Sequence, residues 1–116
     1  MKPDLIIDCD PGHDDAMAIC VGANRGHLIG VTTVAGNVSL EHTTNNALAV
    51  VQMLGIDIEV HSGAKGPING DDGRFASFVH GENGLVGATL PEVTRQVAST
   101  DAADYILSAT IENPGA

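Results

Sequence analysis

The stretch DLIIDCDPGHDDAMAI, residues 4–19, places four aspartates within the eight positions from Asp8 to Asp15. A short apolar run, Leu5-Ile6-Ile7, comes directly before them. Two like charges about 4 Å apart repel each other by roughly 4 kcal/mol at an effective dielectric near 20. A folded chain that gathers these side chains therefore needs an interaction that compensates for their repulsion.

The residues around this stretch alternate between strand and helix patterns. Leu5-Ile6-Ile7 predicts a strand that ends before the turn at Pro11-Gly12. Residues 14–24 follow with apolar side chains at helical spacing, and the β-branched stretch 27–36 predicts a second strand that ends at Gly36.

The same alternation continues along the chain. A second helix is predicted over residues 40–54, with Ser39 as its N-cap and Gly55 at its C-terminal end. Residues 58–64 predict a third strand, and residues 101–112 predict a last helix. This order indicates parallel strands joined by right-handed crossovers, so the expected fold is a doubly wound α/β sheet with flanking helices. Three strands leave at least one sheet edge exposed.

Composition excludes several classes of function. The formal charge of −10 argues against binding to nucleic acid or to an anionic membrane, since both need clustered Lys and Arg. No window approaches the roughly 18 apolar residues of a membrane span. Cys9 and Cys20 lie in a predicted strand and helix, as buried thiols do, which predicts a reducing, cytoplasmic location.

The predicted elements bring the aspartates together. Asp10 falls at the carboxyl end of the first strand, with Asp8 two residues earlier on the same face. Asp14 and Asp15 fall in the first turn of the following helix. These carboxylates therefore meet at the carboxyl edge of the sheet, where doubly wound folds bind ligands.

A divalent cation is the compensation that this cluster favours. A helix N-terminus stabilises nearby negative charge by only about 0.3–1 kcal/mol, which accounts for one or two aspartates and not for four. Ca²⁺ binds six to eight oxygen ligands, and carboxylates supply them. The alternative is that the aspartates serve only as helix caps and turn residues.

Two further polar residues are candidates for the same edge. Asn37 follows the second predicted strand, and its amide can both donate to and accept from a sugar hydroxyl. His80 opens the sequence HGENG, whose glycines are typical of a mobile flap. Taken alone, Asn37 is equally typical of a turn and His80 of a solvated loop.

Three segments together resemble a known family. DCDPGHDDAMAI, TVAGNVSL and VHGENG occur here in the order and at the separations found in the inosine/uridine-preferring nucleoside hydrolases. The likeness extends from about residue 4 to the end of the chain. The resemblance implies hydrolysis of the N-glycosidic bond of a ribonucleoside at a Ca²⁺ site, giving ribose and a free base.

The resemblance also implies a role for each matching residue. Asp10 is expected to bind calcium and to act as general base for a water, and Asp15 to bind calcium through both carboxylate oxygens. Asp14 and Asn37 are expected to hold ribose hydroxyls. Asp8 is expected to support the site from behind, and His80 to lie on a flap over the substrate.

Members of this family are considerably longer, so residues 1–116 correspond to the first part of a single nucleoside hydrolase domain. Three explanations are open: a fragment, a natural truncation, and a partial site that another chain completes. A non-catalytic fragment is accordingly the alternative to an enzyme. The resemblance further implies a homodimer or homotetramer at full length.

A phosphatase of the haloacid-dehalogenase type is a less favoured alternative. That class also begins with an aspartate pair after an apolar strand, but a hydroxyl residue follows the second aspartate by two. Gly12 stands at that place here, and Asp14-Asp15 has no counterpart in that pattern.

Overall fold

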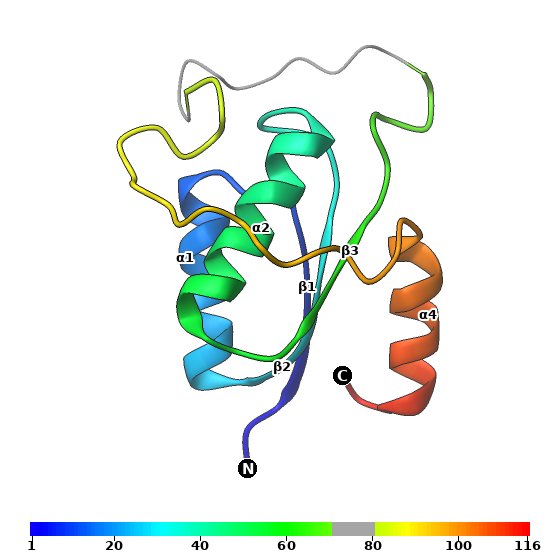
Figure 1. Ribbon diagram of the computed structural model, residues 1–116. Helices are drawn as coiled ribbons and strands as arrows, with labels where there is room; N and C mark the ends of the chain where they lie inside the picture. The colour runs from blue at the N-terminus through cyan, green and yellow to red at the C-terminus, as the bar shows by residue number, and fades with distance from the viewer. Residues whose placement is uncertain (71–80) are drawn as a thin grey trace.

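The computed structural model describes residues 1–70 and 81–116. In these residues, the elements along the chain are β1 (Asp4–Cys9), α1 (His13–Arg25), β2 (His27–Thr33), α2 (Leu40–Leu54), β3 (Glu59–Ser62) and α4 (Ala102–Glu112). The three strands form one parallel sheet in the order β1-β2-β3 (Figure 1). The predicted α/β class with parallel strands is confirmed.

Helices cover both faces of the sheet. Helices α1 and α2 lie on one side of it and α4 lies on the other (Figure 1). Tyr105 fixes α4 to the central strand, because its hydroxyl donates a hydrogen bond to the carbonyl of Ile29 at 3.0 Å. The Tyr105 ring also stacks on His61 of β3, with ring centroids 3.8 Å apart.

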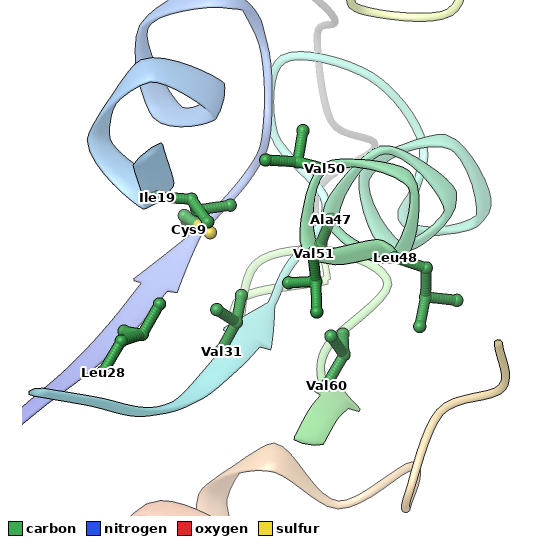
Figure 2. Packing of buried hydrophobic residues seen from close by; sticks show 9 residues of the cluster. All are labelled: Cys9, Ile19, Leu28, Val31, Ala47, Leu48, Val50, Val51 and Val60. Carbon is green, nitrogen blue, oxygen red and sulfur yellow. The ribbon is translucent and has the colours of Figure 1, made fainter. Parts of the chain in front are cut away.

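The hydrophobic core lies between the sheet and the two helices α1 and α2. Burying a Val, Leu or Ile side chain stabilises a fold by about 1.5–3 kcal/mol relative to leaving it exposed. This core therefore fixes α1 and α2 against one face of the sheet. Within the part of the chain that the structure describes, its buried members are Cys9, Ile19, Leu28, Val31, Ala47, Leu48, Val50, Val51 and Val60 (Figure 2).

Local sequence explains the boundaries of α2. Ser39 accepts a hydrogen bond from the backbone N–H of His42, as expected of an N-cap. Gly55 ends the helix with a left-handed backbone, φ 66°, which costs glycine little because it has no Cβ. The predicted bounds of this helix, residues 40–54, are confirmed.

Three predicted strand boundaries are wrong by one to three residues. Strand β2 ends at Thr33 rather than at Gly36, and β3 covers 59–62 rather than 58–64, whereas β1 lies between Pro3 and Pro11-Gly12 as predicted. The β-branched pattern continues past Thr33, but the hydrogen bonds diverge there. The backbone N–H of Val34 donates to the carbonyl of Cys9 on one side, and that of Ala35 donates to the carbonyl of Ala64 on the other. The chain bends there into the loop that carries Asn37.

The two edges of the sheet differ. The segment before α4 runs along β3, where Ala98 donates to the carbonyl of Val60 at 2.9 Å and Ser62 donates to that of Ser99 at 3.0 Å. Strand β1 pairs only with β2 among the described residues. The predicted exposed edge is therefore that of β1.

The predicted burial of the two cysteines is confirmed for Cys9 and wrong for Cys20. None of the helices that the structure describes is long and apolar enough to cross a membrane. Both cysteines are free thiols, Cys9 buried as predicted and Cys20 only half-buried.

Candidate active site

The turn after β1 sets the geometry of the site. Asp10, Pro11 and Gly12 connect β1 to α1, and Gly12 is the N-cap residue of the helix. The next turn carries Asp14 and Asp15, so two carboxylates lie at the positive end of the α1 dipole. The expected placement at the carboxyl edge of the sheet is what the structure shows.

Asp15 reaches back to Asp10. Its Oδ2 accepts a hydrogen bond from the backbone N–H of Asp10 at 3.1 Å. Burial raises the pKa of the Asp15 carboxyl above its ordinary value. Side-chain hydrogen bonding with Asp10 and the charge of Asp14 raise this pKa further, whereas the bond from the Asp10 N–H opposes the rise. The two aspartates therefore form one crowded acidic group.

Asn37 fixes Asp10 from the second loop. Its backbone N–H donates to Asp10 Oδ2 at 2.8 Å, and its side-chain Nδ2 donates to the backbone carbonyl of Asp10 at 2.9 Å. Gly36 makes this approach possible, since a Cβ at that position would collide with Asp10 Oδ2. The two loops predicted to meet at the sheet edge do meet, through these three residues.

Asp8 and Asp14 have different surroundings. Asp8 Oδ1 accepts a hydrogen bond from Thr32 Oγ1 at 2.7 Å, on the neighbouring strand. Asp14 is exposed at the start of α1. The bond to Thr32 ties Asp8 to the sheet, whereas the Asp14 carboxylate remains open to solvent. His80 lies outside the described residues.

Asn46 is a residue of the site that sequence analysis missed. Its side chain is 2% exposed, and its Nδ2 donates to the carbonyl of Pro11 at 3.0 Å and to that of Asn83 at 2.7 Å. It therefore joins the aspartate turn to the segment that follows residue 80. The sequence gives only one sign of this role, an asparagine next to the apolar run of α2 on its buried face. The partners themselves could not be foreseen, because both lie more than 30 positions away.

A second contact joins the same two segments. His13 Nε2 lies 2.9 Å from the carbonyl oxygen of Val86, and Asn83 Oδ1 accepts a hydrogen bond from the backbone N–H of Leu85 at 3.0 Å. The first of these contacts joins the beginning of α1 to residues 83–86, and the second lies within residues 83–86. His13 therefore ties the first turn of α1 to Val86.

The residues present fit part of a site for an oxygen-seeking cation. The hydrogen bonds of Asp10 and Asp15 bring the two together, and carboxylate oxygens are the ligands that Ca²⁺ prefers. Within residues 1–70 and 81–116, no group of three or more His, Cys, Asp or Glu side chains is arranged to hold a metal ion. Asp10 and Asp15 alone do not make up the six to eight oxygens of a complete calcium shell.

Comparison with solved structures defines the class of protein. The fold matches the purine-preferring ribonucleoside hydrolase from Gardnerella vaginalis with a TM-score of 0.82 and 31% sequence identity. The match covers 95% of this chain and 36% of that one. The parallel sheet with its acidic carboxyl edge is thus the fold of a nucleoside hydrolase.

Sequence comparisons agree. The profile of the inosine-uridine preferring nucleoside hydrolases matches residues 5–116, so the chain belongs to this family. It is 42% identical to the pyrimidine-specific ribonucleoside hydrolase RihB of Escherichia coli K12 over 98% of this chain and 37% of RihB. It is 46% identical to an uncharacterised protein of Schizosaccharomyces pombe over 92% of this chain and 33% of that protein. The chain spans about a third of the length of these relatives.

Proposed function

We propose that residues 1–116 carry the water-activating and ribose-binding part of a ribonucleoside hydrolase, whose products are ribose and a free base. The observation that carries this proposal is the convergence of Asp15 and Asn37 on Asp10 at the carboxyl edge of the sheet. Family membership supports the class of reaction. The haloacid-dehalogenase alternative is dropped because the family profile covers almost the whole chain.

Asp10 is the proposed general base. Its Oδ2 accepts the bond from the Asn37 N–H, which fixes the plane of the carboxylate and leaves Oδ1 to accept a proton from water. A base that is held in place in this way speeds proton transfer by about 10²–10⁴-fold. Asn37 thus positions the base as well as facing the substrate.

Asp14 and Asn37 are the proposed ribose contacts. The Asp14 carboxylate is exposed. Asn37 donates to Asp10 from its backbone N–H and from its side-chain Nδ2, and its side-chain carbonyl oxygen is left to accept from a hydroxyl. Fixed hydroxyl contacts hold the sugar in the orientation that the reaction needs. Asp8, bonded to Thr32, is proposed to support the acidic cluster from the sheet.

Ca²⁺ is the proposed cofactor, with Asp10 and Asp15 as ligands. When bound, a divalent cation offsets the carboxylate charge and makes water more acidic. Two carboxylates offer at most four of the six to eight oxygens that Ca²⁺ takes. We therefore propose that the remaining ligands lie in the part of the domain that the relatives have and residues 1–116 do not include.

Calcium titration of the 116-residue chain tests the cation site. Wild-type protein is expected to bind Ca²⁺ weakly by isothermal titration calorimetry, and Asp10→Ala to lose that binding. Asp57→Ala is the matched control, because Asp57 is an exposed aspartate before β3, at the opposite end of the sheet. Equal binding by wild type and Asp10→Ala would contradict the assignment.

Ribose release tests the reaction. In a hybrid in which residues 1–116 replace the matching part of E. coli RihB, Asp10→Ala is expected to lower release from uridine or inosine at least about a hundredfold. Turnover at the wild-type rate would refute the role of Asp10.

The main alternative is that the 116-residue chain is not catalytic by itself. The small number of acidic ligands within the described residues favours it. Weak calcium binding without ribose release from the isolated chain is the expected result. Tight binding with a cooperative melting transition would count against this alternative. The homodimer or homotetramer and the cytoplasmic location remain predictions.

A further inference from the structure

The side-chain amide of Asn46 holds two separate segments with one nitrogen. Its Nδ2 donates to the carbonyl of Pro11, in the turn after β1, at 3.0 Å and to the carbonyl of Asn83 at 2.7 Å. Both N–H bonds of the amide are therefore used, and both acceptors are backbone oxygens. The position of the turn that carries Asp10 is thus tied to that of the segment that contains Asn83.

Two carbonyls of this turn are held by side chains that follow β2 in the sequence. The Asp10 carbonyl accepts from Asn37 Nδ2 at 2.9 Å, and the next carbonyl, that of Pro11, accepts from Asn46. Pro11 has no N–H, so its carbonyl is the one group through which a hydrogen bond can hold this residue. Asn37 and Asn46 therefore fix the two successive peptide groups that follow the Cα of Asp10.

The backbone of Gly84 covers the bond between Asn46 and Pro11. A Cβ at position 84 would lie 2.9 Å from Asn46 Nδ2 and 3.1 Å from the Pro11 oxygen, so the glycine backbone packs directly against both. Gly84 has φ 89°, a conformation that glycine adopts readily because it has no Cβ. Asn46 is only 2% exposed, so little water reaches this bond. A hydrogen bond in such a place is stronger than one exposed to water.

The hydrophobic core does not by itself call for an amide at position 46. Ala47 and Val50, which follow Asn46 on α2, belong to the core. An apolar side chain would also fill space beside them, and it would have no N–H groups to satisfy. What the amide adds is a fixed position for two loops, one of which carries Asp10.

We propose that Asn46 is a positioning residue for the proposed hydrolysis. Through the Pro11 carbonyl it holds the backbone of Asp10 at the place from which the Asp10 carboxylate takes a proton from water. Through the Asn83 carbonyl it keeps Gly84 packed over that bond. The inference rests on the proposed role of Asp10 as general base. Misplacing a reacting group by about 1 Å can cost roughly a hundredfold in rate, so the loss of a bond one residue from the base has a measurable effect.

The first experiment measures ribose release by the hybrid of residues 1–116 with the rest of E. coli RihB. Asn46→Ala removes both donors and is expected to lower kcat at least about tenfold. The KM is expected to stay within about threefold of the wild-type value, because the substituted side chain is not one of the proposed ribose contacts. Asn45→Ala is the matched control, since it makes the same substitution one residue earlier at an exposed position, and it is expected to change neither constant.

A binding measurement separates positioning from a loss of folded protein. A C-nucleoside, in which a carbon–carbon bond replaces the N-glycosidic bond, occupies the site without being hydrolysed by this reaction. Isothermal titration calorimetry is expected to give Asn46→Ala the same binding stoichiometry as the wild-type hybrid. A stoichiometry that falls in proportion to kcat overturns the proposal, and so does a raised KM with an unchanged kcat.

The activities of two variants distinguish this inference from the proposed function. Ribose release by Asp10→Ala at the wild-type rate would refute the general base, and with it the positioning role. Full activity of Asn46→Ala beside an inactive Asp10→Ala would overturn the positioning role alone.

Amide exchange in the 116-residue chain tests the same contact without catalysis. The backbone N–H of Asp10 is expected to exchange at least about tenfold faster in Asn46→Ala than in wild type or Asn45→Ala. In the wild-type chain, the side-chain amide protons of Asn46 are expected to exchange at least about tenfold more slowly than those of Asn45, a comparison that needs no substitution. Equal rates in either comparison overturn the proposal.

Discussion

Cys9 is a thiol that the fold makes unreactive. Burial raises its pKa far above the ordinary value, and the charges of Asp15, Asp8 and Asp10 add to the effect. Its Sγ donates to the carbonyl of Thr32 at 3.6 Å. Because the thiolate is the reactive form, iodoacetamide is expected to modify half-buried Cys20 first and Cys9 only after unfolding.

Mass spectrometry of timed alkylation measures this order directly. Cys20→Ser is the control, since it leaves Cys9 as the one cysteine and should render the native protein resistant. Modification of Cys9 in native protein at the rate of Cys20 would show that the strand opens far more readily than its burial implies.

Asp15 makes stability depend on pH in a direction that can be worked out. Its pKa is raised in the folded state, so its carboxylate form is disfavoured by folding. The stability linked to its protonation is present below the ordinary pKa near 4 and is lost as pH rises through the raised value. In calcium-free buffer at pH 7, Asp15→Asn is therefore expected to raise the Tm.

The difference in Tm between wild type and Asp15→Asn should shrink as the pH falls below about 4, where Asp15 is protonated in both states. Thermal melts across this range measure it. A lower Tm for Asp15→Asn at pH 7 would mean that hydrogen bonding to the carboxylate outweighs its burial and repulsion.

At the scale of elements, Asn46 connects α2 to two loops. Asn46→Asp keeps the size of the side chain but replaces a double donor with oxygens that face two carbonyls. It is expected to lower the free energy of unfolding by roughly 2–3 kcal/mol, because buried carbonyls lose their donors. Urea denaturation measures the change.

Asn45→Asp is the control for Asn46→Asp, since it makes the same substitution one residue earlier at an exposed position. Its effect is expected to stay within about 0.5 kcal/mol. Equal losses in the two variants would show that Asn46 has no special part in joining the loops.

The elements show which local signals suffice for prediction. Helix α2 was predictable to the residue because Ser39 and Gly55 are strong local caps. The end of β2 was not, because Val34 and Ala35 continue the β-branched pattern while their hydrogen bonds diverge. The end of a helix or strand can be predicted where a single nearby side chain determines it. It cannot be predicted where hydrogen bonds to residues far away in the sequence determine it.

The candidate site divides along the same line. The approach of Asp10, Asp15 and Asn37 follows from parallel strands, since their loops open on one edge. The two hydrogen bonds from Asn37 to Asp10, and those by which Asn46 joins two loops, connect residues that are 27 to 37 positions apart in the sequence. No periodicity in the sequence encodes such contacts. The roles of Asp8, Asp14 and His80 remain predictions.

At the scale of the molecule, uncompensated negative charge is the main electrostatic feature. The formal charge is −10, and the ion pairs between described residues join histidines to carboxylates, His27 to Asp4 and His61 to Glu59. Excess like charge destabilises a compact state, and salt screens it. Raising choline chloride from about 10 to about 150 mM, which shortens the Debye length from roughly 30 to 8 Å, is expected to raise the Tm.

Choline chloride is chosen because its cation is too large to occupy the proposed cation site at Asp10 and Asp15. Circular dichroism melts at each concentration measure the effect, and an equimolar sucrose series serves as the uncharged control. A Tm that falls with added salt would mean that the histidine ion pairs outweigh the general repulsion.

The collision that any Cβ at position 36 would make with Asp10 has an evolutionary consequence. Every substitution of glycine by another amino acid adds at least one carbon to the side chain. Substitutions at position 36 are therefore expected to be selected against, whereas neighbouring positions can accept side chains of similar size. In a library of random variants selected for a folded chain, position 36 should return as glycine.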